Sequence, residues 1–384
     1  MQIPDYQGRC LANLMTSLIS GLGGTPSCHK PLLALPPEEV ARHRHVVLVV
    51  VDGLGDQFLQ TRPAPFLNGH RRTGIHAVFP TTTATGVTTF LTGDAPAQHG
   101  LTGWHIHFRE LGAVMAVLPG KPRYGGSGYD QVADLDVLNW LKHEVTFNRI
   151  PVVSALVSPN RIAHTPFNKA HKGQARLFPF RTLQSMVNRV EEVVKKRPDI
   201  SYTYAYWSEL DHLGHRYGPD APLTRRHLET IDDALSVLAA RLRGTDTLLI
   251  VTADHGMTAV NHQLLLADYP EIADCLMLPL CGEPRVAWAY VRHGWHERFQ
   301  ALVKAQLGQV CTLRPSAELL EEGWFGPGVP HPELAARIGD YALLMHPGWI
   351  ISDQMLTEKP FDLKGVHGGL TPEELEVPLV VTVC

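Results

Sequence analysis

Four short, mostly apolar runs stand out along the chain, at 46–51, 202–207, 247–252 and 378–383. The first reads Val-Val-Leu-Val-Val-Val and contains no polar residue. Continuous runs of this length are typical of strands that are buried on both faces of a parallel sheet. We therefore predict four strands that belong to one central sheet.

Apolar residues at helical spacing lie between these runs. Residues 9–21 carry them on one face and end at Gly21, and glycine commonly stops a helix. Helical patterns also cover residues 182–196 and 222–242. Because strands alternate with helices, we predict an α/β fold with a mostly parallel central sheet and helices on both faces.

The stretch 105–200 is less regular than the rest and contains turn pairs such as Pro119-Gly120 and Gly125-Gly126. We interpret it as a partial cap inserted into the domain rather than as an independent unit. Residues 270–350 are similarly mixed. No internal repeat divides the chain. We therefore predict a single catalytic domain over residues 1–384.

Composition narrows the classes of protein. With 44% hydrophobic and 19% charged residues the chain is typical of a globular protein, and its net charge of −4 argues against a protein that coats nucleic acid. No run approaches the roughly 18 apolar residues of a membrane span. The six cysteines form no C-x-x-C pair, and the N-terminus resembles no signal peptide, so we expect a cytoplasmic location. The 21 histidines favour metal binding.

Acidic and imidazole side chains follow three of the predicted strands. In an open α/β sheet ligands bind beyond the carboxyl ends of the strands, so these side chains are expected at one edge. A further histidine lies in a glycine-rich loop, where the backbone can approach a ligand closely. Taken singly, several of these residues fit an ordinary turn. The set is Asp52, Asp211, His215, Asp254, His255 and His367.

The types of these side chains indicate the class of metal. Carboxylates and imidazoles without thiolates suit zinc or manganese at a catalytic site. Asp211 and His215 would lie one helical turn apart. The neighbours Asp254 and His255 can act together only in a turn, which Gly256 permits.

A threonine-rich segment over 79–93 supplies a candidate nucleophile. A loop that opens a helix, with hydroxyls and free N–H groups at its start, is an anion site. A threonine hydroxyl held on a metal ion can lose its proton and become a nucleophile. The pattern alone leaves Thr81, Thr82, Thr83 and Thr85 open.

Seven segments, in this order, resemble the alkaline phosphatase superfamily, most closely its nucleotide pyrophosphatase/phosphodiesterase (type I phosphodiesterase) branch. The ending H-G-G-L-T-P-E-E-L-E-V-P-L is also similar to that of cofactor-independent phosphoglycerate mutases of the same superfamily. The segments are 51–54 (V-D-G-L), 79–83 (F-P-T-T-T), 91–93 (L-T-G), 99–100 (H-G), 211–219 (D-H-L-G-H-R-Y-G-P), 252–257 (T-A-D-H-G-M) and 367–369 (H-G-G).

The resemblance implies an alkaline phosphatase-like fold with two divalent metal ions, zinc or alternatively manganese. It also implies that Thr83 attacks phosphorus to form a phosphothreonine intermediate, which water then hydrolyses. One metal ion would be bound by Asp211, His215 and His367, and the other by Asp52, Asp254, His255 and the Thr83 oxygen.

The chain also departs from the diesterase pattern. Residues after the nucleophile differ from the family's T-F-P-N-H, and the family's asparagine, which holds a phosphoryl oxygen, aligns with Trp104 beside His105. Arg109, Lys121 and Arg123 are further candidates for substrate binding, although such charges are also typical of a solvated surface. No C-x-P-x-R segment is present, which argues against a sulfatase.

We therefore expect a two-metal hydrolase of small phosphate esters that cleaves phosphodiester or nucleotide pyrophosphate bonds. A phosphomonoesterase or phosphonate hydrolase of the same superfamily is the alternative, and a catalytically inactive metal-binding protein is a remote one. We expect neither a nucleic-acid polymer nor a membrane as partner. No sequence pattern indicates the oligomeric state.

Overall fold

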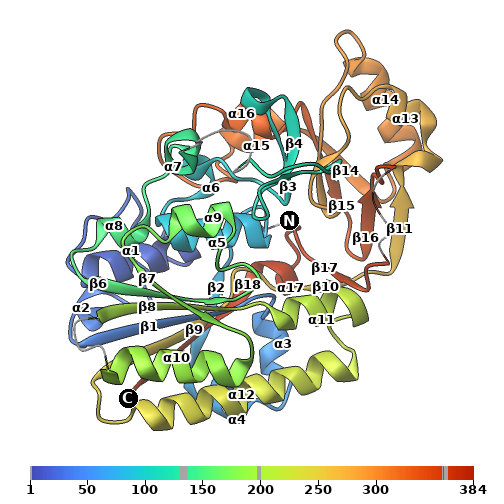
Figure 1. The fold of residues 1–384 in the computed structure, drawn as a ribbon. Helices are drawn as coiled ribbons and strands as arrows, with labels where there is room; N and C mark the ends of the chain where they lie inside the picture. The colour runs from blue at the N-terminus through green and yellow to red at the C-terminus, as the bar shows by residue number, and fades with distance from the viewer. Residues whose placement is uncertain (1, 130–135, 197–199, 357, 359–361) are drawn as a thin grey trace.

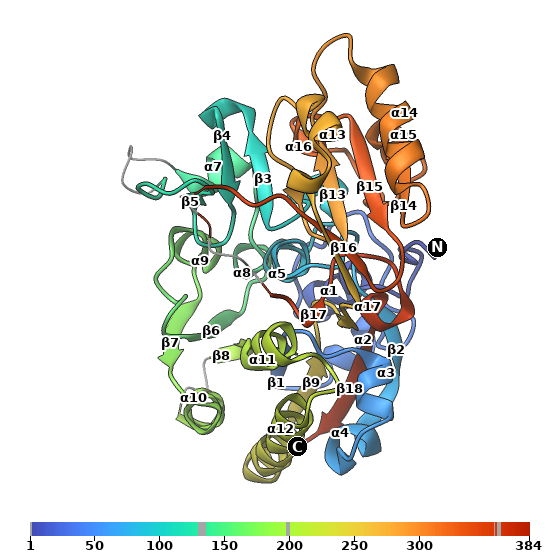
Figure 2. The same cartoon turned by 90° about the vertical axis from the view of Figure 1, so that its right-hand side faces the viewer.

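Two seven-stranded sheets organise the part of the chain that the computed structural model describes, which is residues 2–129, 136–196, 200–356, 358 and 362–384. The first sheet lies with its helices at one end of the molecule, and the second stands beyond the carboxyl ends of its parallel strands (Figures 1 and 2). None of the helices in the described residues has the length and apolar character needed to cross a membrane.

The first sheet contains all four predicted strands. β1 pairs in parallel with β8 and β9, and all seven residues of β1 are buried. β18 departs from this parallel arrangement, because it runs antiparallel to both of its neighbours, β9 and β2. In spatial order the strands are β2 (Arg71–His76), β18 (Glu376–Val383), β9 (Thr247–Thr252), β1 (His45–Val51), β8 (Ile200–Trp207), β6 (Val153–Pro159) and β7 (Arg176–Phe180).

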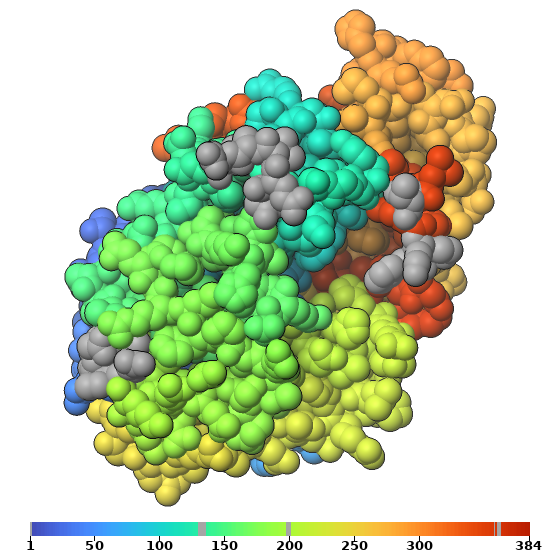
Figure 3. Space-filling view, viewed as in Figure 1, coloured from blue at the N-terminus to red at the C-terminus, as the bar shows by residue number. Residues whose placement is uncertain are grey.

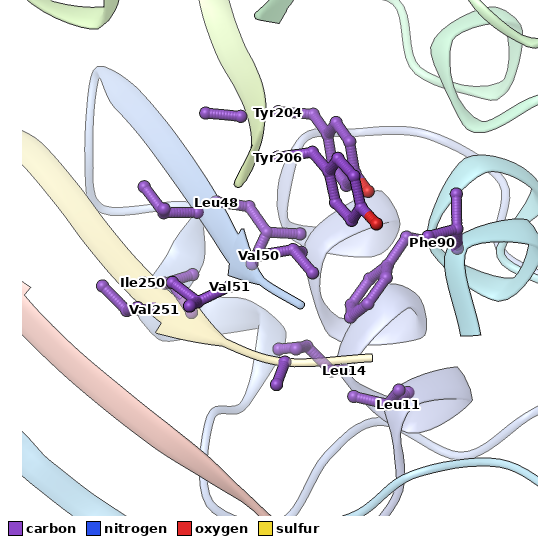
Figure 4. Packing of buried hydrophobic residues seen from close by; sticks show 14 of the residues in the cluster. Leu11, Leu14, Leu48, Val50, Val51, Phe90, Tyr204, Tyr206, Ile250 and Val251 are labelled. Atoms are coloured by element: carbon purple, nitrogen blue, oxygen red, sulfur yellow. The ribbon is translucent and has the colours of Figure 1, made fainter. Parts of the chain in front are cut away.

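Helices cover both faces of this sheet, as predicted (Figure 1). The three predicted helices are α1 (Leu11–Gly21), α10 (Leu183–Lys196) and α12 (Pro222–Leu242). Figure 4 shows part of the core, in which Leu11 and Leu14 of α1 and Leu48 of β1 belong to one cluster of buried residues. Shorter helices are α2 (Pro37–Val40), α3 (Asp56–Gln60), α4 (Pro65–His70), α5 (Thr83–Thr92), α6 (Pro96–His99), α8 (Thr146–Arg149), α9 (Pro166–His171), α11 (Glu209–Tyr217) and α17 (Pro372–Leu375).

The second sheet is antiparallel and built from short strands. In spatial order they are β14 (Cys311–Pro315), β15 (Tyr341–Met345), β13 (Val286–Ala289), β12 (Cys281–Gly282), β3 (His105–Phe108), β4 (Ala113–Ala116) and β5 (Lys121–Pro122). Its helices are α7 (Val137–Leu141), α13 (Pro270–Asp274), α14 (His296–Leu307), α15 (Ser316–Glu321) and α16 (Leu334–Arg337). Two strand pairs complete the fold, β10 (Thr258–Ala259) with β17 (Gly365–Val366), and β11 (His262–Leu265) with β16 (Trp349–Ser352).

The stretch 105–200, expected to form one partial cap, divides between the two sheets. Its beginning supplies β3, β4 and β5 to the second sheet, which residues 281–345 complete. Its later part supplies β6 and β7 to the first sheet and α10 to the helices that cover it. Six of the seven residues of β6 are buried there. Residues 130–135 and 197–199 of the stretch lie outside the described residues.

Candidate active site

The predicted ligands gather where the parallel strands of the first sheet end. Asp52 directly follows β1, and Asp254 and His255 follow the neighbouring strand β9 after one intervening residue, Ala253. On the other side of β1, strand β8 leads into α11, which carries Asp211 and His215 one turn apart. Parallel pairing of β8, β1 and β9 therefore brings these five side chains to one edge, as the strand pattern predicts.

Each of the three predicted histidine ligands is oriented by a backbone carbonyl. A carbonyl only accepts hydrogen bonds, so the imidazole Nδ1–H must donate, and in the neutral ring Nε2 keeps its lone pair for a ligand. All three Nε2 atoms therefore have the form that binds a metal ion. The accepting carbonyls are those of Gly365 for His215 (2.9 Å), Gly256 for His255 (2.9 Å) and Thr81 for His367 (3.1 Å).

The first ligand group consists of Asp211, His215 and His367, whose ligand atoms lie within 4.8 Å of one another. Asp211 Oδ1 is 3.3 Å from His215 Nε2 and 3.8 Å from His367 Nε2. The two Nε2 atoms lie 3.2 Å apart. Two lone pairs at this distance repel each other unless a cation or a proton lies between them, so the geometry fits a cation.

The second ligand group surrounds His255. Its Nε2 lies 3.2 Å from Asp52 Oδ1 and 3.7 Å from Asp254 Oδ2. The Thr83 hydroxyl oxygen lies 3.1 Å from the same nitrogen. The ligand atoms of Asp211, Asp52 and His255 also lie within 4.8 Å of one another, so the two groups are adjacent.

Buried carboxylate oxygens in both groups have no hydrogen-bond partner in the described residues. They are Oδ1 of Asp52, Oδ1 of Asp211 and Oδ2 of Asp254. Burying an unpaired carboxylate costs so much free energy that such groups normally bind a cation or take up a proton. These oxygens and the oriented imidazoles together fit two divalent metal ions.

The electrostatics of the site point the same way. Burial, with the Asp52 carboxylate nearby, raises the pKa of Asp211 and Asp254 well above the usual range. Burial lowers the pKa of His255, but the surrounding carboxylates outweigh it and raise that pKa to about 10. Asp211, Asp254 and His255 therefore take up protons when no other cation neutralises the site.

Thr83 is the first residue of α5, which begins beside the end of β9. The helix approaches so closely that a Cβ atom on Gly86 would lie 2.7 Å from Asp254 Cβ. Thr81 donates its hydroxyl hydrogen to the carbonyl of Gly369, at 2.7 Å. Among the four candidate threonines, Thr83 alone lines the cavity described next.

A cavity of about 620 Å³ opens above these groups. Figure 3 shows the surface hollowed where α11 faces segments of the second sheet. The predicted Trp104, His105 and Arg123 line the cavity, whereas Lys121 is exposed and lies outside it. Arg109 also lies outside and pairs with Glu333 at 2.8 Å. Thr83, Asp211, His215 and His367 lie in the same cavity lining.

Two residues of the site have no counterpart in the sequence prediction. Glu283 is buried beside β12, lines the cavity and accepts hydrogen bonds from the Thr82 hydroxyl and from Trp104 N. Burial raises the pKa of Glu283 to about 7. Tyr206, near the end of β8, donates its hydroxyl hydrogen to Asp52 Oδ2. The sequence offered one signal for Tyr206, which is its position near the carboxyl end of a predicted strand that leads to candidate ligands.

Comparisons with known proteins agree with this geometry. Human ectonucleotide pyrophosphatase/phosphodiesterase family member 5 is 25% identical over 338 residues, which cover 84% of this chain and 65% of the human protein. The chain therefore spans less than two thirds of that relative's length.

Solved structures with the same fold include two proteins that are named for different reactions. An inactive threonine-to-alanine variant of murine ectonucleotide pyrophosphatase/phosphodiesterase 5 in complex with AMP has a TM-score of 0.64 at 20% identity, covering 87% of each chain. Phosphonoacetate hydrolase from Sinorhizobium meliloti in complex with phosphonoformate also has 0.64 at 20% identity, covering 88% of this chain and 90% of that one. The likeness to both confirms the expected α/β fold.

Residues 46–370 match the family described as type I phosphodiesterase / nucleotide pyrophosphatase. The matched range contains every residue of both ligand groups, together with Thr83. Since it also spans most of the chain, the protein belongs to the type I phosphodiesterase / nucleotide pyrophosphatase family.

Proposed function

We propose that the protein hydrolyses phosphodiester or nucleotide pyrophosphate bonds of small molecules. The observation that carries the proposal is the position of Thr83, whose hydroxyl oxygen lies 3.1 Å from His255 Nε2 and which lines the cavity together with the first ligand group. Membership of the family supports it. The presence of the nucleophile and of all six ligands speaks against the inactive alternative.

Two divalent ions fit the two groups, and we propose zinc, with manganese as the alternative that the same donors accept. Asp211, His215 and His367 would hold one ion, and Asp52, Asp254 and His255 the other. When bound, such ions supply positive charge that stabilises the attacking and departing oxygens of an in-line displacement.

The chain's own residues supply the nucleophile and its position. Thr83 Oγ1 loses its proton and bonds to phosphorus while the bond from phosphorus to the departing oxygen breaks, and that oxygen takes up a proton. Water then attacks the phosphothreonine, which releases the phosphate product and restores the Thr83 hydroxyl. Because Thr83 begins α5, the positive end of the helix dipole favours the phosphoryl charge.

The test compares Thr83→Ala and Thr83→Ser with the unchanged protein, using bis(p-nitrophenyl) phosphate and p-nitrophenyl phosphate after loading with zinc. We expect faster cleavage of the diester, loss of at least about 1,000-fold in kcat for Thr83→Ala, and substantial activity for Thr83→Ser, which keeps a hydroxyl. Removal of metal with EDTA should abolish turnover.

Thr230→Ala, on the exposed side of α12, is the matched control and should leave the rate unchanged. Full activity of Thr83→Ala would contradict the proposal. Faster cleavage of the monoester would favour the phosphomonoesterase alternative. A phosphonate hydrolase would instead release phosphate from phosphonoacetate.

A further inference from the structure

The outer part of the active-site cavity is poor in groups that could bind an anion. Arg123 is the one lysine or arginine among the described residues that line it. His105 also lines it, but burial, together with the nearby Arg123 guanidinium, lowers the pKa of that imidazole to about 4, so His105 is uncharged near neutral pH. The response of this region to a charged substrate therefore depends on Arg123 and on the acidic side chains.

Arg123 is already occupied by the protein. Its Nε and Nη2 donate to the two carboxylate oxygens of Glu358, at 2.9 and 3.0 Å. Nη1 donates to the carbonyl of Leu280 at 2.7 Å, and Nη2 also donates to the carbonyl of Asp353. Four of its five N–H donors are thus used, and its side chain is only 7% exposed. The Glu358 carboxylate cancels its charge, so Arg123 does not present a free cation to a ligand.

Two further carboxyl groups line the same cavity, and neither has a basic hydrogen-bond partner among the residues that the structure describes. Asp353 accepts a hydrogen bond from Leu280 N at 2.9 Å through Oδ2. Glu283 accepts from Thr82 and from Trp104 N through Oε1 alone. With the Arg123–Glu358 pair neutral overall, Asp353 makes the charge of the described lining beyond the metal ligands negative. Glu283, whose pKa is about 7, adds to this charge only when it is ionised.

The rest of the lining is apolar. Leu265, Leu280, Ile351 and Leu363 form part of the wall, and Trp104 adds an aromatic side chain near the phosphoryl end. Apolar walls favour the transfer of an uncharged organic group from water, and an indole ring also attracts organic cations. A substrate with a second anionic group would instead meet carboxylates in a region that desolvates it.

We propose that this cavity selects phosphodiesters whose organic group is cationic or neutral, and rejects those that carry a further phosphate or carboxylate, with Asp353 and the Arg123–Glu358 pair as specificity-determining residues. The inference rests on the proposed function and narrows it to diesters without additional negative charge. It disfavours nucleoside polyphosphates and phosphonoacetate as substrates.

Three p-nitrophenyl phosphodiesters of nearly equal shape test the proposal. Their second ester group is 2-(trimethylammonio)ethyl, 3,3-dimethylbutyl or a carboxylate-bearing chain of the same length, and all three release the same p-nitrophenolate. On zinc-loaded protein we expect kcat/KM to fall from cation to neutral to anion, with about tenfold or more between the first and the last.

Two variants examine the residues named. Asp353→Asn keeps an acceptor for Leu280 N but removes the charge, and should bring the cation-to-neutral ratio close to one. Glu358→Gln leaves Arg123 without its carboxylate and should raise the relative rate for the anionic ester. Asp233→Asn, on the exposed surface of α12, is the control and should change neither ratio.

Equal kcat/KM for the three esters, or a preference for the anionic one, would overturn the inference and leave the proposed function intact. Ratios that neither Asp353→Asn nor Glu358→Gln alters would overturn the assignment of these residues. Absence of turnover with all three esters would instead contradict the proposed function, and the inference with it.

Discussion

Individual side chains at the site act through partners that are distant in sequence. His367 is oriented by the carbonyl of Thr81, and His215 by that of Gly365. That the six candidate ligands lie close together could be predicted, because each occupies a short motif after a strand or in a glycine-rich loop. Glu283 could not, since it stands in no motif and reaches Thr82 only through the folding of the second sheet.

The buried carboxyl of Glu283 leads to a prediction about how the unfolding free energy depends on pH, which can be measured without an activity assay. Burial raises the pKa of its carboxyl from 4.5 to about 7 in the folded protein. A raised pKa means that the contribution to stability is complete below pH 4.5 and is lost as the pH rises through 7. In metal-free protein, Glu283→Gln should therefore gain about 3 kcal/mol of unfolding free energy relative to Glu283 between pH 4.5 and 8.

Urea denaturation of both proteins in EDTA, at pH 4.5, 6 and 8, measures this difference. The glutamine oxygen can still accept the bonds from Thr82 and Trp104, and the other titrating groups are common to both proteins, so they cancel in the comparison. A difference in unfolding free energy that stays constant across the three pH values would show that the pKa of Glu283 is the same in the folded and the unfolded protein.

Among the elements, α5 is placed by its contact with the end of β9. Gly86 allows this contact, because a Cβ atom there would lie 2.8 Å from the carbonyl oxygen of Asp254 and 3.1 Å from its Cα. Alanine is normally the better helix residue, by about 1 kcal/mol. In Gly86→Ala the helix must instead move away from Asp254 and carry Thr83 with it. We expect about a 100-fold loss of kcat, as a displacement of about 1 Å can produce.

Gly69→Ala is the matched control, because Gly69 lies in α4 and a Cβ atom there would meet nothing within 4 Å. It should keep full activity. Diesterase assays and thermal unfolding of both variants separate the effects of helix propensity and of contact. Normal turnover of Gly86→Ala would show that α5 can shift without moving the nucleophile.

The elements also show which parts of the fold are predictable. β1 and β9 are continuous apolar runs because both faces of their sheet are covered, and such runs are read directly from the sequence. β5 and β12 contain two residues each, which is too short for any periodicity to appear. The antiparallel direction of β18 depends on its neighbours β2 and β9, and its own residues carry no sign of it.

At the scale of the whole molecule, the two ligand groups join segments from Asp52 to His367. They connect the ends of β1 and β9, helix α11 and the loop after β17. A metal ion that binds the folded protein and not the unfolded chain stabilises the fold by mass action. Metal binding should therefore raise the melting temperature, in addition to any effect on catalysis.

The size of this effect should depend on pH. In the metal-free protein the pKa values of Asp211, Asp254 and His255 are raised, so these groups contribute stability at low pH that is lost as the pH rises through the raised values. Metal ions bind only the deprotonated ligands, so they compete with protons and bind more tightly at high pH. The increase in melting temperature between EDTA-treated and zinc-loaded protein should thus be larger at pH 8 than at pH 5.5.

His367→Ala, which removes a ligand of one group and leaves the other, should reduce the increase without abolishing it. An equal increase at both pH values would mean that the carboxylates are ionised without metal and that no proton is displaced when zinc binds.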